Sequence, residues 1–189
     1  MTSGAPAALH GHTLSVLVEN TPGVLSRITA LFSRRGFNID SVTEGRTEHP
    51  ACSRLTLVVH ADPQALEQVA KQVGKLVNVL KVTELPPGSA LQRELVLVKV
   101  RSQSGTLSRI TEIVQLFHAR TVDVSPESVT VEASGTGEKL EAMLEMLDPF
   151  GITELVRSGT IAIGRGPESS SSGLVRRSPE ARPASSCAS

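Results

Sequence analysis

The chain has 189 residues and no formal net charge, with 19 basic and 19 acidic side chains, so it lacks the positive field typical of nucleic-acid and anionic-membrane binders. Its 39% hydrophobic content fits a globular protein, and without Trp or Tyr the core must consist of aliphatic residues. Two cysteines are too few for a disulfide framework, and no apolar run approaches the roughly 20 residues of a membrane span. Residues 1–11 also lack the features of a secretory signal, so the sequence predicts a cytoplasmic protein.

The first part of the chain predicts a ferredoxin-like βαββαβ unit. Thr21 is the expected N-cap of the first helix, Pro22 occupies its first position, and Gly36 is its left-handed stop. Asp62 and Pro63 open the second helix by the same logic. The predicted elements are, in order, strand 12–19, helix 21–35, strands 38–43 and 54–60, a helix from residue 63, and strand 77–85.

The same order of elements repeats after a short Pro- and Gly-containing linker. The run Leu-Ser-Arg-Ile-Thr occurs at 25–29 and again at 107–111, which favours internal duplication. The repeat is predicted as strand 94–100, helix 105–119, strands 121–124 and 128–133, helix 139–147, and a strand over 152–163 that breaks near Ser158-Gly159. We therefore expect an α+β protein with domains at 12–85 and 93–165, a linker at 86–92, and a disordered Ser/Pro-rich tail at 166–189.

The turn between the first strand and the first helix carries the strongest functional signal. Gly23 stands where a helix begins, so backbone N–H groups are left free there to bind a small carboxylate. The side-chain oxygens of Asn20 and Asn38 can accept from an ammonium group, although both residues are equally explained as turn formers. An open four-stranded sheet also leaves edge strands that need a partner. Edge-to-edge pairing in a symmetric homodimer brings this turn to a subunit junction and predicts an amino-acid site there.

These residues resemble the ACT domain, a ferredoxin-like module that senses small molecules. More specifically, the chain resembles the small, regulatory subunits of acetolactate synthase, also called acetohydroxyacid synthase. The resemblance covers residues 13–166. It rests on residues 14–20, 23–27, 31–41, 93–100, 122–125, 139–142 and 158–166.

The resemblance implies a subunit that activates a separate catalytic subunit and confers feedback inhibition by a branched-chain amino acid, typically valine. That role belongs to valine, leucine and isoleucine biosynthesis. The resemblance also implies that thiamine diphosphate, Mg and FAD are held only by the catalytic partner, with no cofactor on this chain. The implied effector contacts are Asn20, Gly23 and Asn38, with Val24, Leu25 and Ile39 nearby. At the corresponding positions the second module has Ser102 and Asp123, so it is not expected to bind valine in the same way.

No catalytic or metal site is expected on this chain. Ser26 and Ser108 have no evident base, and His49 and His60 have no companion at ligand spacing. One alternative function is a stand-alone ACT-type amino-acid sensor that regulates another enzyme or transcription; the latter requires a DNA-reading element, which the sequence does not show. Another is an RNA-binding ferredoxin-like domain, which requires aromatic side chains for base stacking that these strands lack.

Overall fold

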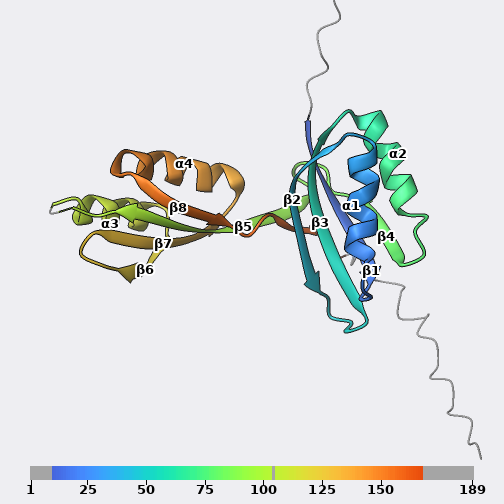
Figure 1. Ribbon diagram of the computed structural model, residues 1–189, viewed down its shortest axis with the longest axis horizontal. Helices are drawn as coiled ribbons and strands as arrows, with labels where there is room; N and C mark the ends of the chain where they lie inside the picture. Colours follow the sequence, from blue (N-terminus) through green and yellow to red (C-terminus); the bar gives the residue numbers. More distant parts are fainter. Residues whose placement is uncertain (1–9, 104, 168–189) are drawn as a thin grey trace, which may run out of the picture.

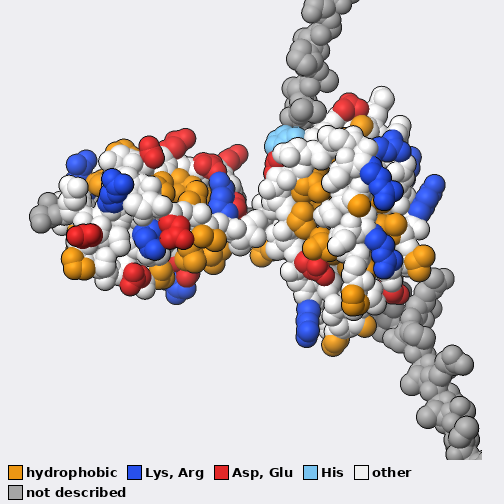
Figure 2. Space-filling view, viewed as in Figure 1, with side chains coloured by type: hydrophobic (Ala, Val, Ile, Leu, Met, Phe, Trp, Pro, Cys, Tyr) orange, Lys and Arg blue, Asp and Glu red, His pale blue; other side chains and the backbone are white. Residues whose placement is uncertain are grey.

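The computed structural model describes residues 10–103 and 105–167, which form two modules joined through a narrow waist (Figures 1 and 2). The elements of the first module are β1 (His10–Glu19), α1 (Val24–Arg34), β2 (Asn38–Arg46), β3 (Cys52–Ala61), α2 (Pro63–Val73) and β4 (Val79–Glu84). Its sheet has the strand order β2-β3-β1-β4. Both helices cover the face of the sheet that is turned away from the second module (Figure 1). We call the opposite face of this sheet the open face.

The core of the first module lies between the helices and the sheet. Alternate strand residues, such as Val16 and Leu57, point toward Ile28 and Phe32 of α1 and are fully buried there. The residues between them point to the open face and are mostly polar. Period-two alternation in the strands and helical spacing in α1 and α2 therefore suffice to explain this layer structure.

The elements of the second module are β5 (Ala90–Arg101), α3 (Leu107–Leu116), β6 (Arg120–Val124), β7 (Ser128–Gly135), α4 (Gly137–Leu147), a 3₁₀ turn (Asp148–Phe150), β8 (Ile152–Arg157) and β9 (Ile161–Gly164). Its sheet has the order β6-β7-β5-β8, and β9 pairs with the first residues of β5. The predicted fold of two successive ferredoxin-like modules is thus confirmed. Residues 90–92 of the expected linker lie within β5, and residues 168–189 of the expected tail lie outside the described part of the chain.

Several predicted helix and strand boundaries are confirmed, and one is wrong. Asp62 caps α2 by accepting from the Ala65 N–H at 3.3 Å, and Gly36 has the expected positive φ of 73°. The predicted break in the last strand occurs at Gly159, whose φ is 78°. In contrast, α1 begins at Val24 with Gly23 as N-cap, whereas the sequence predicts Thr21 as the cap. The reason is that the Thr21 N–H bonds back to the Glu19 carbonyl at 2.8 Å, so the chain is still turning at that point.

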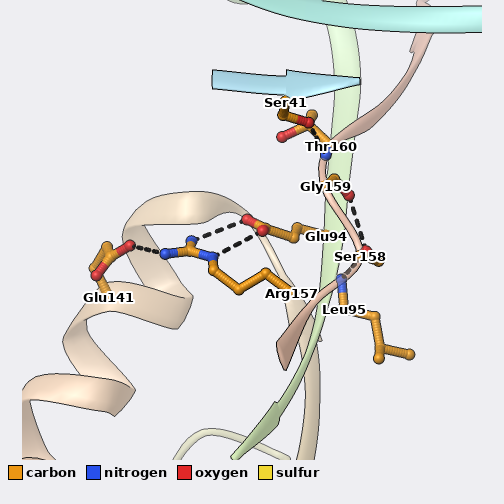
Figure 3. Close-up of polar contacts among 8 residues, drawn as sticks. All are labelled: Ser41, Glu94, Leu95, Glu141, Arg157, Ser158, Gly159 and Thr160. Atoms are coloured by element: carbon orange, nitrogen blue, oxygen red, sulfur yellow. Dashed lines mark hydrogen bonds and ion pairs between the residues drawn. The ribbon is translucent and has the colours of Figure 1, made fainter. Parts of the chain in front are cut away.

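The two modules meet where the corner between β8 and β9 rests on β2 (Figure 3). The Thr160 N–H donates to Ser41 Oγ at 2.9 Å, and Gln92 Nε2 donates to Thr13 Oγ1 at 3.1 Å. Next to Thr160, Gly159 approaches β2 so closely that a Cβ there would lie 2.6 Å from Ser41 Oγ. Glycine is therefore required at position 159 for two reasons: the backbone is left-handed there, and a side chain would clash with Ser41.

An arginine anchors this corner to the second module (Figure 3). The Arg157 guanidinium donates to both oxygens of Glu94 at 2.8 and 3.0 Å and also to Glu141 of α4. Hydrogen bonds to Glu94 and then to Glu141 raise the pKa of Arg157 above its ordinary value, so it stays charged at every physiological pH. The next residue, Ser158, accepts from the Leu95 N–H at 3.0 Å. The corner is therefore fixed to β5 before it reaches β2.

Replacing the junction glycine should open the contact between modules. We expect Gly159→Ala to displace the Ser41 hydroxyl and make hydrogen exchange at the Thr160 amide about tenfold faster or more, because one protecting hydrogen bond is lost. Gly88→Ala is the matched control, since Gly88 also has a positive φ, 82°, but nothing within 4 Å of the added Cβ. Equal exchange rates at Thr160 in both variants would contradict this account of the junction.

Candidate effector-binding turn

The turn from β1 into α1 is held in place by backbone hydrogen bonds rather than by a side-chain cap. The Asn20 N–H donates to the Ala51 carbonyl at 2.8 Å, which ties the end of β1 to the start of β3. Gly23 then takes a left-handed conformation, with φ 82° and ψ 0°, and its side of the turn is exposed. The chain can therefore enter the helix abruptly, and a ligand can approach its backbone.

The first turn of α1 offers backbone donors without acceptors. The first intrahelical bond runs from the Arg27 N–H to the Gly23 carbonyl at 3.2 Å. Within residues 10–103 and 105–167, no partner accepts from the N–H groups of Val24, Leu25 or Ser26. No acidic residue occupies this first turn, so its partial positive charge is not neutralised by the helix itself. This arrangement suits a carboxylate.

A side-chain bridge that the sequence does not reveal supports the turn from the adjacent loop. The Asn78 carboxamide accepts from Arg27 Nη1 at 2.8 Å and donates to Glu19 Oε2 at 2.8 Å. Arg27 is an exposed residue in the first turn of α1. In the structure its guanidinium bends over the turn, where Nη2 lies 3.8 Å from the position of a Cβ on Gly23. Arg27 thus adds a cation beside the free N–H groups.

One chain brings together only part of the predicted site. Asn20 and Gly23 lie together, whereas Asn38 lies at the far end of the sheet, because it pairs with His60 and His60 pairs with Gly11 near the start of β1. The two ends are separated by the nine residues of β2, about 30 Å of strand. In the chain as described, the Asn38 carboxamide donates to Asp40 Oδ1 at 3.1 Å.

The apolar residues expected near the effector differ in exposure. Val24 is only 4% exposed and belongs to the core of the first module. Leu25 and Ile39 are partly buried and pack against the same core, each leaving some surface at its own end of the sheet. A ligand side chain at the turn therefore meets Leu25 and not Val24.

The corresponding turn of the second module has different chemistry. Ser102 repeats the backbone contact of Asn20, since its N–H donates to the Glu127 carbonyl at 2.8 Å, but Ser102 is buried. The Thr106 hydroxyl accepts from the Gln103 N–H at 2.9 Å and closes the start of α3. Gly105 has a positive φ of 93°, as Gly23 does. The backbone turn is thus repeated, while the carboxamide of Asn20 is not.

Residues 10–103 and 105–167 contain no group of three or more His, Cys, Asp or Glu side chains arranged to hold a metal ion. None of their helices is long and apolar enough to cross a membrane.

Tandem ferredoxin-like modules with a glycine-capped first helix define a two-module protein of the ACT class. The family described as the ACT domain of acetohydroxyacid synthase small subunits matches residues 14–81, and the family described as the small subunit of acetolactate synthase matches residues 93–166. The chain belongs to the acetolactate synthase small-subunit family.

Relatives along nearly their whole length support this assignment. The chain is 57% identical to the acetolactate synthase small subunit of Mycobacterium leprae, over 82% of this chain and 92% of the relative. It is 52% identical to that of Mycolicibacterium smegmatis, over 88% and 96%. The crystal structure of the small subunit from Thermotoga maritima superposes with a TM-score of 0.78 at 38% identity, covering 85% of this chain and all of that one.

Removing the bridge should loosen the turn. We expect Asn78→Ala to lower the free energy of unfolding of the first module by about 1 kcal/mol, because it deletes two side-chain hydrogen bonds between segments distant in sequence. Asn38→Ala removes one hydrogen bond within a single strand and is expected to cost less. Urea denaturation of both variants measures the difference, and equal costs would contradict a supporting role for Asn78.

Proposed function

We propose that this chain is the regulatory subunit of acetolactate synthase, which activates the catalytic subunit and makes it sensitive to a branched-chain amino acid. Family membership supports the partner and the pathway, and the free N–H groups at the start of α1 support amino-acid binding. Valine is the first effector to test. The proposal assigns thiamine diphosphate, Mg and FAD to the catalytic subunit and places the complex in the cytoplasm.

The chemistry of the turn matches an amino-acid zwitterion. The ligand carboxylate accepts from the N–H groups of Leu25 and Ser26 and faces the Arg27 guanidinium. The ligand ammonium donates to carboxamide oxygens, of which Asn20, at the start of the turn, supplies one on the same chain. The apolar side chain of the ligand lies against Leu25. A larger or smaller aliphatic ligand changes only this last contact.

A homodimer completes the site with the second asparagine. Among the described residues β2 pairs only with β3, so it is an edge strand there. If two copies of β2 pair antiparallel about a twofold axis near Val42, Asn38 of one copy lies opposite Arg46 of the other. Arg46 pairs with Ser53, which pairs with Val18, so the start of the partner's β2 lies at the level of the turn that follows β1. The 30 Å separation within one chain therefore supports a site made by two chains.

A carboxylate added at the turn should abolish feedback and spare activation. We expect Gly23→Asp to weaken valine inhibition of the reconstituted enzyme at least about tenfold, because the new charge repels the ligand carboxylate and its Cβ blocks the approach. Activation of the catalytic subunit should change little, since the substitution is confined to an exposed turn.

The second module supplies the matched control for this experiment. Gly105→Asp makes the same chemical change at a glycine with φ 93° and open space around it. It should leave valine inhibition unchanged. Loss of inhibition in both variants, or in neither, would contradict assignment of the effector to the first turn.

Two inactive variants should restore feedback when mixed. We expect Gly23→Asp and Asn38→Ala each to abolish valine binding in its own homodimer. In the mixed dimer both substitutions fall in one site, and the other site combines an intact Gly23 with the intact Asn38 of the partner. Calorimetry should therefore find one restored valine site per mixed dimer. Absence of any restored binding in a verified mixed dimer would place both residues in a single-chain site and contradict the proposal.

A further inference from the structure

The open face of the first sheet carries a cavity that lies away from the effector turn. β9 and the residues after it pass over this face and border a partly open space of about 830 Å³. Its floor consists of residues from all four strands of the first sheet, and its roof is residues 161–167. None of residues 20–27 lines it. This volume is in the range of cavities that hold small molecules.

A row of four hydroxyl groups crosses the floor of the cavity. The strand register places Thr43 beside Thr56, Thr56 beside Ser15, and Ser15 beside Thr83. Ser15 and Thr56 are only 5% and 3% exposed. Within residues 10–103 and 105–167, none of these four hydroxyls has a protein hydrogen-bond partner. Thr43 Oγ1 is buried beside Gly159, 2.9 Å from the position of a Cβ there, whereas the hydroxyls of Ser15, Thr56 and Thr83 are available to a ligand in the cavity.

Cationic side chains surround the hydroxyl row. Arg54 and Lys81 both flank Leu17 in the next row of the same register. Arg46 lines the cavity from β2, and Arg165 from the segment after β9. In the described ranges none of these four cations forms an ion pair. They outnumber the carboxylates of the lining, which are those of Glu44 and Glu48.

The second sheet shows that this arrangement is not a property of the fold. The row of its uncovered face that corresponds to the hydroxyl row has Leu97 at the position of Ser15 and consists of Arg120, Glu132, Leu97 and Val156. Arg120 there is neutralised by Glu132 at 2.6 Å. That row contains no hydroxyl and one carboxylate. The same architecture thus carries an oxyanion-accepting surface in only one of its two copies.

We propose that the cavity binds a small molecule that carries a phosphate group. The phosphate oxygens accept from the hydroxyls of Ser15, Thr56 and Thr83 and from the side chains of Arg54 and Lys81. A single phosphate does not fill 830 Å³, so the remaining volume receives an organic group against Leu85 and Ala162. The proposal does not depend on the effector turn, since it shares no residue with it.

Nuclear magnetic resonance of the isotopically labelled full-length chain tests the proposal. Inorganic phosphate and phenyl phosphate are titrated at constant ionic strength, with phenol as the ligand without phosphate. We expect amide shifts at Gly45, Thr56 and Ala162 with both phosphates and none with phenol. Tighter binding of phenyl phosphate identifies a phosphate ester as the ligand, and equal binding identifies free phosphate.

Variants of cavity residues distinguish specific phosphate binding in the cavity from nonspecific attraction of anions to the surface. Arg54→Gln should weaken phosphate binding about tenfold, and Thr56→Val severalfold. The controls are Arg34→Gln, a change at an unpaired arginine in the last turn of α1, and Thr130→Val in the second sheet. Both should bind as the unmodified chain does. The proposal is overturned if amide shifts are confined to residues 24–26 or if no shifts occur in the cavity. It is also overturned if Arg54→Gln and Arg34→Gln lose the same amount of phosphate affinity. These outcomes hold whatever the valine experiments show.

Discussion

A single strand, β5, holds both halves of this molecule together. Its first four residues pair with β9 beside the open face of the first sheet, and the rest of the strand is central in the second sheet. The chain can return from β8 to β9 only because Gly159 accepts a left-handed backbone and a close approach to Ser41. Without this corner β9 would not cover the first sheet. The cavity on the open face and the contact between modules therefore depend on one glycine.

The same corner connects the candidate effector site with the second module. β2 begins with Asn38 and Ile39, and three residues after Asn38 the Ser41 hydroxyl accepts from Thr160. Asp40 between them forms a bulge, where the register with β3 shifts. In the homodimer that we propose, a ligand that contacts Asn38 therefore acts on the strand against which the second module rests. A coupling of about 1–3 kcal/mol through this short path is enough for feedback control.

The sequence predicts the elements well because their signals are local. Alternation, helical spacing, the Asp62-Pro63 cap and the glycine at 159 each act within a few residues, and the structure confirms them. The cap of α1 could not be predicted, because Thr21 and Gly23 both satisfy local rules, and the turn before the helix decided between them. Asn78 had no signal, since its partners Glu19 and Arg27 are more than 50 residues away. The hydroxyl row also escapes the sequence, because it exists only once the register of four strands is known.

Alternation along each strand explains how one fold supports two different surfaces. In the central strands of both sheets the residues that face the helices are mostly aliphatic and fully buried, as Val16 is in β1 and Val98 in β5. These positions fix the fold and tolerate little change. The intervening positions face away and are free of that constraint. On the first sheet they carry hydroxyls and unpaired cations, and on the second they carry a neutralised Lys99 beside exposed Leu95 and Leu97. The two modules can therefore share the inward pattern that fixes their architecture. Their outward faces can still differ in charge and in hydrogen-bonding groups.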